Sequence, residues 1–184
     1  MSTVATWISL LRAINLGSRN QVSMPALRRA LEADGFCDVR THLQSGNVVA
    51  ESVHRSPAKV AESVNAVVKQ EFGLDVPVIV RTAEQLRHVV EANPFPEAAR
   101  ERPKILHVSF LAAIPAAAGV QTLVDHELTR QVCRVEGDNL YIDYVDGVHT
   151  SKLTSAFFAR RLGVDGTARN WRTVLALVEL TGWG

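Results

Sequence analysis

The chain has 184 residues, 47% of them hydrophobic, which is enough to bury a core and excludes a disordered polypeptide. Its 20 Lys and Arg against 19 Asp and Glu leave a net charge of +1, so no global field attracts nucleic acid or an anionic membrane. Only two cysteines occur, Cys37 and Cys133, and no uncharged stretch approaches the roughly 20 residues that span a bilayer, so we expect a soluble, cytoplasmic protein with reduced thiols.

The first part of the chain predicts the order strand, helix, two strands, helix, strand. Residues 4–12 carry apolar side chains on both faces, which favours a central strand covered from both sides. Ser23 and Ser56 are helix caps, and turn residues separate the remaining segments. The expected elements after the first strand are a helix over 24–34, a hairpin over 39–50, a helix over 57–72 and a strand over 76–80. This is the order of a ferredoxin-like half.

The same order begins again after a connecting region. Thr82 and Gln85 form a capping box for a short helix that runs to Val90, and residues 93–103, rich in proline and charge, are expected to be a linker. Residues 109–114 then match residues 9–14 at four of six positions, an offset of 100. The next expected elements are a helix over 115–124, a hairpin over 132–144, a helix over 153–162 and a last helix that contains Trp171.

The predicted fold class is therefore α+β, with two ferredoxin-like halves of βαββα type packed together and a C-terminal helix. Its predicted parts are a first half over 1–81, a helix and linker over 82–103, and a second α+β half with C-terminal helices over 104–184. Ferredoxin-like sheets leave one face open, so we expect the two halves, or two subunits, to cover each other's open faces.

Three stretches resemble a known family: residues 11–17, residues 44–49 and residues 167–173. Together they are similar to domain-of-unknown-function family 1697, a set of uncharacterised bacterial proteins. Residues 93–96 and 151–154 are weaker matches, so the resemblance extends over nearly the whole chain. It implies an α+β protein with ferredoxin-like halves, and it supplies no activity, cofactor or catalytic residue.

Polar residues in three segments are candidates for a ligand site. Residues 151–172 contain five basic residues and one acid, and the last helix begins beside them, so a phosphate or carboxylate could bind there. We expect a small anionic ligand in a polar cleft between the two halves. The candidate ligand-binding residues are Arg12, Asn15, Gln44, Ser45, Asn47, Lys152, Arg169, Asn170 and Arg172.

A simpler interpretation of the same residues is structural. In that interpretation residues 44–47 are turn chemistry, Thr167 or Asn170 is a helix cap, and the arginines are solvated or paired with acids. Self-association or protein interaction through a sheet edge or helix face is an alternative function. Weak binding of single-stranded nucleic acid by the C-terminal basic patch is a second alternative.

The sequence excludes several other kinds of site. The spacings of Cys37 with His42 and of His126 with Cys133 match no paired metal ligands, so no metal is expected. A nucleophile elbow and a phosphate-binding loop are both missing, so no cofactor and no catalytic residue are assigned. Trp7 is the only aromatic residue expected on the central strands, which excludes a base-stacking platform. The choice between a binding protein and an enzyme stays open, as does the oligomeric state.

Overall fold

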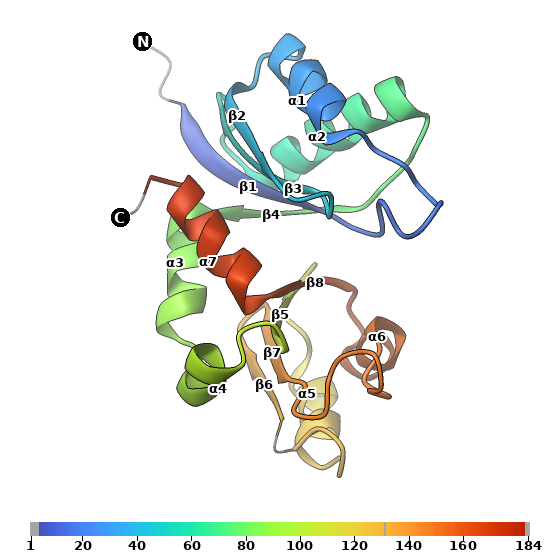
Figure 1. Ribbon diagram of the computed structural model, residues 1–184, viewed down its shortest axis with the longest axis vertical. Coiled ribbons are helices and arrows are strands. Elements are labelled where there is room, and N and C mark those ends of the chain that lie inside the picture. The colour runs from blue at the N-terminus through green and yellow to red at the C-terminus, as the bar shows by residue number, and fades with distance from the viewer. Residues whose placement is uncertain (1–3, 131, 183–184) are drawn as a thin grey trace. The chain divides into compact units, whose positions relative to one another are not determined.

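The computed structural model describes residues 4–130 and 132–182 (Figure 1). Residues 1–3, 131 and 183–184 lie outside the described part. The first three residues of the predicted half 1–81 and the last two residues of the predicted half 104–184 are among them. Internal contacts divide the chain into two compact units, Met1–Arg87 with Ala176–Gly184, and His88–Leu175. The part boundaries proposed from the sequence, at 81 and 103, stay a prediction.

The first unit contains a four-stranded antiparallel sheet with the strand order β2-β3-β1-β4. Its elements in chain order are β1 (Ala5–Leu11), α1 (Met24–Ala33), β2 (Cys37–His42), β3 (Asn47–Ser52), α2 (Pro57–Phe72) and β4 (Val78–Thr82). The alternation of strands and helices and this order are those of a ferredoxin-like unit, so the fold class inferred from the sequence is confirmed.

Helices α1 and α2 cover one face of this sheet (Figure 1). The hydroxyl of Ser23 accepts from the amide of Ala26, and that of Ser56 from the amide of Lys59, so both helices begin at the predicted caps. Leu27 of α1 and Val64 of α2 pack with Trp7 on the same side of the sheet. This face is the hydrophobic core of the unit.

The opposite face of the same sheet is also buried. Ile8 of β1 pairs with Val49 of β3 on one side and with Arg81 of β4 on the other, so the three side chains share that face. All three are buried, as is Leu10 two residues along β1. Burial on both faces is what the doubly apolar first strand predicts. That the other half covers this face stays a prediction.

The second unit contains another four-stranded antiparallel sheet, with the order β6-β7-β5-β8. The remaining elements in chain order are α3 (Ala83–Glu91), α4 (Pro96–Glu101), β5 (Leu106–Leu111), α5 (Ala117–Val124), β6 (Cys133–Glu136), β7 (Asn139–Asp143), α6 (Ser155–Leu162), β8 (Gly166–Asn170) and α7 (Trp171–Leu180). Side chains of β5, β7, α5 and α6 form its core. Helix α3 shows the predicted capping box, in which Thr82 and Gln85 exchange two hydrogen bonds.

This unit contains two elements that the sequence did not predict. The segment 93–103, expected to be a linker, contains α4, because Pro96 takes the first helical position, where no amide hydrogen is needed, and Ala98 is buried. Residues 166–170, for which no element was predicted, form strand β8. The strand was difficult to recognise because one of its buried positions is the charged Arg169, so buried and exposed residues do not alternate as apolar and polar ones. Thr167 and Arg169 are both buried on the same face of the strand.

The two sheets repeat each other residue for residue at an offset of 100 in their first strands. Leu10 lies opposite Asn47 on the third strand of its unit, and Phe110 lies opposite Asn139. The fourth strands agree as well, with Arg81 opposite Ile8 and Arg169 opposite Val108. The internal match seen in the sequence therefore marks a structural repeat.

The connections differ in length between the repeats: those after the first helix and after the third strand are longer in the second unit, whereas the two described next are longer in the first. The first strand is joined to the first helix by residues 12–23 in the first unit and by the shorter 112–116 in the second. The hairpin turn spans 43–46 in the first unit and only 137–138 in the second. Because the second unit closes the same fold with shorter connections at these two places, the fold does not require the extra residues of the first unit there. In the described part of the chain, no helix has the length and apolar character needed to cross a bilayer.

Candidate functional site

The two long connections of the first unit form one group, which we call the loop cluster and define as residues 12–23 and 43–46. Five non-glycine residues in the described ranges have a positive φ, and four of them lie in the loop cluster. Their φ values are 56° at Ala13, 52° at Asn15, 49° at Asn20 and 58° at Leu43. Such conformations are strained for residues with a side chain, and they concentrate at binding and active sites.

Asn15 joins the two connections. Its side-chain amide donates to the carbonyl oxygen of Gln44 at 2.6 Å and to that of Val22 at 3.0 Å. Its Oδ1 accepts from the amide of Val22 at 2.8 Å. Because one side chain bridges the two connections, their positions are set relative to each other before any ligand arrives.

The hairpin turn packs closely against Leu11 and Ile14 at Gly46. Gly46 has φ +78°, and a Cβ there would stand 2.8 Å from Cβ of Leu11 and 2.9 Å from Cδ1 of Ile14. Only glycine therefore fits both the conformation and the space. Asn47 comes next, fully buried, and donates to the carbonyl of His42 and to the hydroxyl of Ser45, each at 2.9 Å. The predicted residues Ser45 and Asn47 thus brace the turn.

An open depression of about 540 Å³ lies against the loop cluster. It is lined by Asn15, Gln21, Val22, Ser23, Pro25 and Gln44, none of them charged. The first 31 residues of the chain contain no Asp or Glu, and residues 43–46 contain none either. Arg12 and the exposed Arg19 belong to residues 12–23, so this connection carries a net positive charge.

Several hydrogen-bond donors that line the depression already bond to other atoms of the protein. The side-chain amide of Gln21 donates to the carbonyls of Gly17 at 2.7 Å and Arg19 at 3.3 Å. The N-terminus of α1 offers few amides, because Pro25 has none and that of Ala26 donates to Ser23. The side chains of Arg19 and Gln44 are exposed to solvent.

Among the predicted site residues, the structure groups Asn15, Gln44, Ser45 and Asn47, with Arg12 at the end of β1 in the same cluster. The sequence did not point to Gln21 and Ser23, which also line the depression. Gly17 and Asn20, both typical of left-handed backbone, are the signal that residues 16–20 form a folded loop rather than a plain connector.

Two of the predicted site residues in the second unit, Arg169 and Asn170, make hydrogen bonds within that unit. Arg169 is buried in β8, where its Nη1 donates to Oγ1 of Thr167 and to the carbonyl of Ala168, each at 2.8 Å, and burial lowers its pKa to about 10. Oδ1 of Asn170 accepts from the amide of Thr173 at 2.9 Å, so Asn170 caps the first turn of α7, as the structural interpretation predicts.

The last two predicted residues are exposed. Arg172 lies on α7. Lys152 lines a depression of about 270 Å³ in the second unit, where Asp143 and Asp146 also contribute. Asp143 there accepts two hydrogen bonds from Arg102, at 2.6 and 3.1 Å, and the bond to Asp143 is the main cause that raises the pKa of Arg102. With two carboxylates in its lining, this depression fits an anion less well than the loop cluster does.

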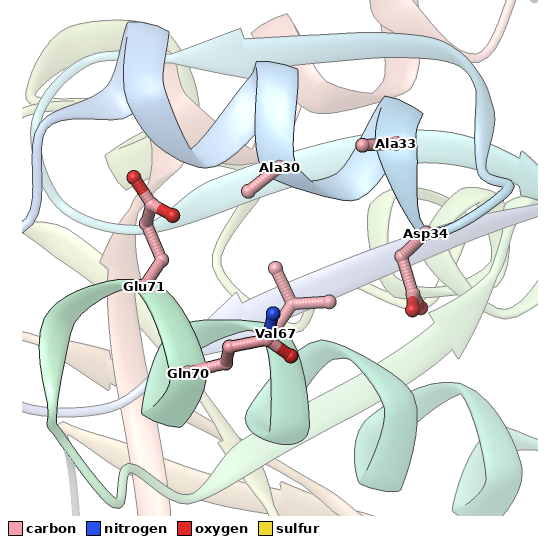
Figure 2. A pocket seen from close by; sticks show the side chains of 6 residues that line it. All are labelled: Ala30, Ala33, Asp34, Val67, Gln70 and Glu71. Carbon is pink, nitrogen blue, oxygen red and sulfur yellow. The ribbon is translucent and has the colours of Figure 1, made fainter.

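A further groove lies between α1 and α2 of the first unit, with a volume of about 200 Å³ (Figure 2). Figure 2 shows Ala30 near its middle, with Asp34 and Glu71 on either side. The carboxylate of Asp34 accepts from the hydroxyl of Ser63 at 2.8 Å. The groove is small and acidic, so it does not favour an anionic ligand.

Buried titratable groups in the second unit show no catalytic arrangement. Burial raises the pKa of Cys133 to about 12, which leaves an unreactive thiol. Burial also lowers the pKa of His107, whose ring meets that of Tyr144 edge to face at 5.2 Å. Over the described ranges no group of three or more His, Cys, Asp or Glu is placed to hold a metal ion.

Comparison with known proteins supports the fold and the family resemblance. The family model described as "Protein of unknown function (DUF1697)" matches residues 4–141. The solved structure of the conserved bacterial protein SP0830 from Streptococcus pneumoniae is similar, with a TM-score of 0.74 and 18% sequence identity over 98% of this chain and 99% of that one. No curated protein matches the chain. The resemblance seen in the sequence is thus confirmed, and the similarity to SP0830 is one of fold.

Proposed function

The chain belongs to the DUF1697 family, and we propose that it binds a small anionic ligand through the loop cluster of its first unit. The observation that carries the proposal is the depression of about 540 Å³, which is lined by uncharged polar and apolar residues. Arg12 and Arg19 belong to one of the two connections that line it. Its volume lies within the few hundred to about a thousand Å³ of ordinary small-molecule sites. The missing acids and the nearby guanidinium groups favour a phosphate or a carboxylate.

Comparison of the two repeats supports the same assignment. Residues 12–23 and 43–46 are longer than their counterparts at 112–116 and 137–138, and they carry left-handed residues that cost free energy. Asn15 and Gly46 then hold the strained segments in one arrangement. A surface that is both dispensable for the fold and rigidly built is typical of a binding site.

In this proposal Arg19 supplies charge and two-pronged hydrogen bonding, Gln44 orients the ligand, and Asn15 positions both connections without needing to touch it. Asn15 and Asn47 are engaged with backbone and turn atoms, so they act as positioning residues. Lys152, Arg169, Asn170 and Arg172, which the sequence placed in the same cleft, are not required.

Binding can be tested on the intact chain with defined probes. Inorganic phosphate, glucose 6-phosphate and citrate are titrated while thermal unfolding and amide NMR shifts are followed. A probe at 100 times its dissociation constant stabilises the fold by about 2.7 kcal/mol. We expect at least one probe to raise the unfolding temperature and to shift the amides of residues 12–23 and 43–46. If none of the three does so, the proposal is wrong.

Two variants locate the site. Arg19→Gln removes the charge from the loop cluster and is expected to weaken probe binding about tenfold or more, the usual cost of a charge-assisted hydrogen bond. The matched control is Arg160→Gln, which removes an exposed arginine from the basic segment 151–172 of the second unit. Equal weakening by both variants would move the site away from the loop cluster.

A further inference from the structure

Two leucines of the loop cluster are exposed at the surface. Leu16 is 60% exposed and Leu43 is 61% exposed. They are the chain neighbours of Asn15 and Gln44, which both line the depression and are joined by the hydrogen bond of 2.6 Å. Each connection of the loop cluster therefore carries an exposed apolar side chain next in sequence to a residue that lines the depression.

Leu43 is an unfavourable residue for its position unless it contacts something outside the chain. Its φ of +58° is left-handed, a conformation that is strained for a residue with a branched side chain. The shorter turn of the second unit has Gly137 at φ +59°. Glycine or asparagine would relieve the strain at Leu43, and the exposed side chain gains little from burial in return. A strained and exposed apolar side chain is thus better explained by binding than by folding.

These observations extend the proposed function. We infer that the ligand of the loop cluster is an amphiphilic anion, a phosphate or carboxylate that carries a linear alkyl chain, with the alkyl chain packed on Leu16 and Leu43. The headgroup meets Arg19 and Gln44, and the alkyl chain removes the two leucines from water. This inference rests on the proposed function, because it requires the anion site to exist.

The test is a homologous series of ligands. Methyl, butyl, hexyl and octyl phosphate are titrated into the intact chain below their micelle concentrations, with acetate, butyrate, hexanoate and octanoate as the carboxylate arm. Fully burying one methylene group strengthens binding about fourfold, so affinity should rise two- to fourfold for each added methylene until the chain outgrows the leucines. The arm that binds more tightly identifies the headgroup.

Variants of the two leucines test whether they cause the rise of affinity with alkyl-chain length. Leu16→Ser and Leu43→Asn remove the apolar groups, and asparagine tolerates the left-handed conformation, so the turn keeps its shape. Both variants should flatten the dependence on chain length while methyl phosphate binds as before. Ile114→Ser is the control, because Ile114 is 74% exposed and lies in the corresponding connection of the second unit.

The outcomes separate the two proposals. If no member of either series binds, the anion site itself is wrong. If all members bind with equal affinity, the anion site stands and the amphiphilic ligand is wrong. A slope that persists in Leu16→Ser and Leu43→Asn, or that Ile114→Ser abolishes, also overturns the inference.

Discussion

The side-chain amide of Asn15 donates a hydrogen bond of 2.6 Å to the carbonyl oxygen of Gln44, 29 residues further along the chain. The same side chain exchanges two more bonds with the backbone of Val22. A single side-chain amide thereby holds together residues 12–23 and 43–46, the two connections of the loop cluster.

Asn15→Asp should loosen the loop cluster without removing the acceptor. Aspartate also tolerates φ +52° and keeps an oxygen for the amide of Val22, but it loses the two donated bonds. At roughly 0.5–1.5 kcal/mol a bond, the unfolding free energy should fall by about 1–3 kcal/mol, measured by urea denaturation. Asn20→Asp is the matched control, because Asn20 is also left-handed but donates only one such bond, to Ala13. An equal loss in both variants would contradict the bridging role.

Gly46→Ala should destabilise the protein more than Gly73→Ala. Both glycines are left-handed, with φ +78° and +69°, so each substitution carries a backbone cost of about 1 kcal/mol. Only at Gly46 does the new Cβ meet Leu11 and Ile14, at less than 3 Å, whereas nothing lies within 4 Å at Gly73. We expect a further loss of roughly 1–3 kcal/mol at Gly46 from overpacking, read from the urea midpoints of the two variants. Similar midpoints would show that the turn can move away from β1.

Stability should fall as the solution is acidified, partly through His107. Burial lowers the pKa of His107 below its ordinary value of 6.5, so the unfolded chain takes up the proton more readily than the folded one. The unfolding free energy should therefore decrease as the pH falls below about 6.5 and level off below the folded pKa, with a slope of at most about 1.4 kcal/mol per pH unit.

His107→Gln should remove that part of the pH dependence between pH 7 and 5. The exposed His149→Gln is the control and should leave the dependence as in the unchanged protein. Denaturation curves at several pH values provide the measurement. If His107→Gln and His149→Gln give the same curves, His107 is not the group that titrates.

Arg169→Ala should be costly and Arg172→Ala nearly neutral, although both belong to the basic segment singled out in the sequence. The guanidinium of Arg169 is buried and bonded to Thr167 and Ala168, so truncation leaves unpaired acceptors and a cavity worth roughly 2–4 kcal/mol. Arg172 is exposed, and its loss should change the unfolding free energy by less than about 0.5 kcal/mol. Equal, small effects in thermal or urea unfolding would argue against a structural role for Arg169.

Much of the fold could be predicted because its signals are local. The caps at Ser23 and Ser56, the capping box of Thr82 with Gln85 and the alternation in the hairpins each depend on neighbouring residues. Strand β8 and helix α4 escaped prediction for the opposite reason. Strand β8 depends on its pairing with β5, where Arg169 lies opposite Val108, far away in the sequence. Pro96 begins a helix or ends one depending on the packing of the residues after it.

The candidate site likewise has features that could be predicted from the sequence and features that only the folded chain shows. Polar and glycine residues at 12–17 and 44–47 were visible in the chain, but nothing local shows that Asn15 reaches Gln44 or that Gly46 lies against Leu11. Element order, helix caps and the internal repeat could be read from the residues alone, because they depend on contacts a few residues apart. Which polar residues meet was settled by the folded chain, since that depends on strand pairing and on side-chain bonds that span 29 residues in the case of Asn15 and Gln44.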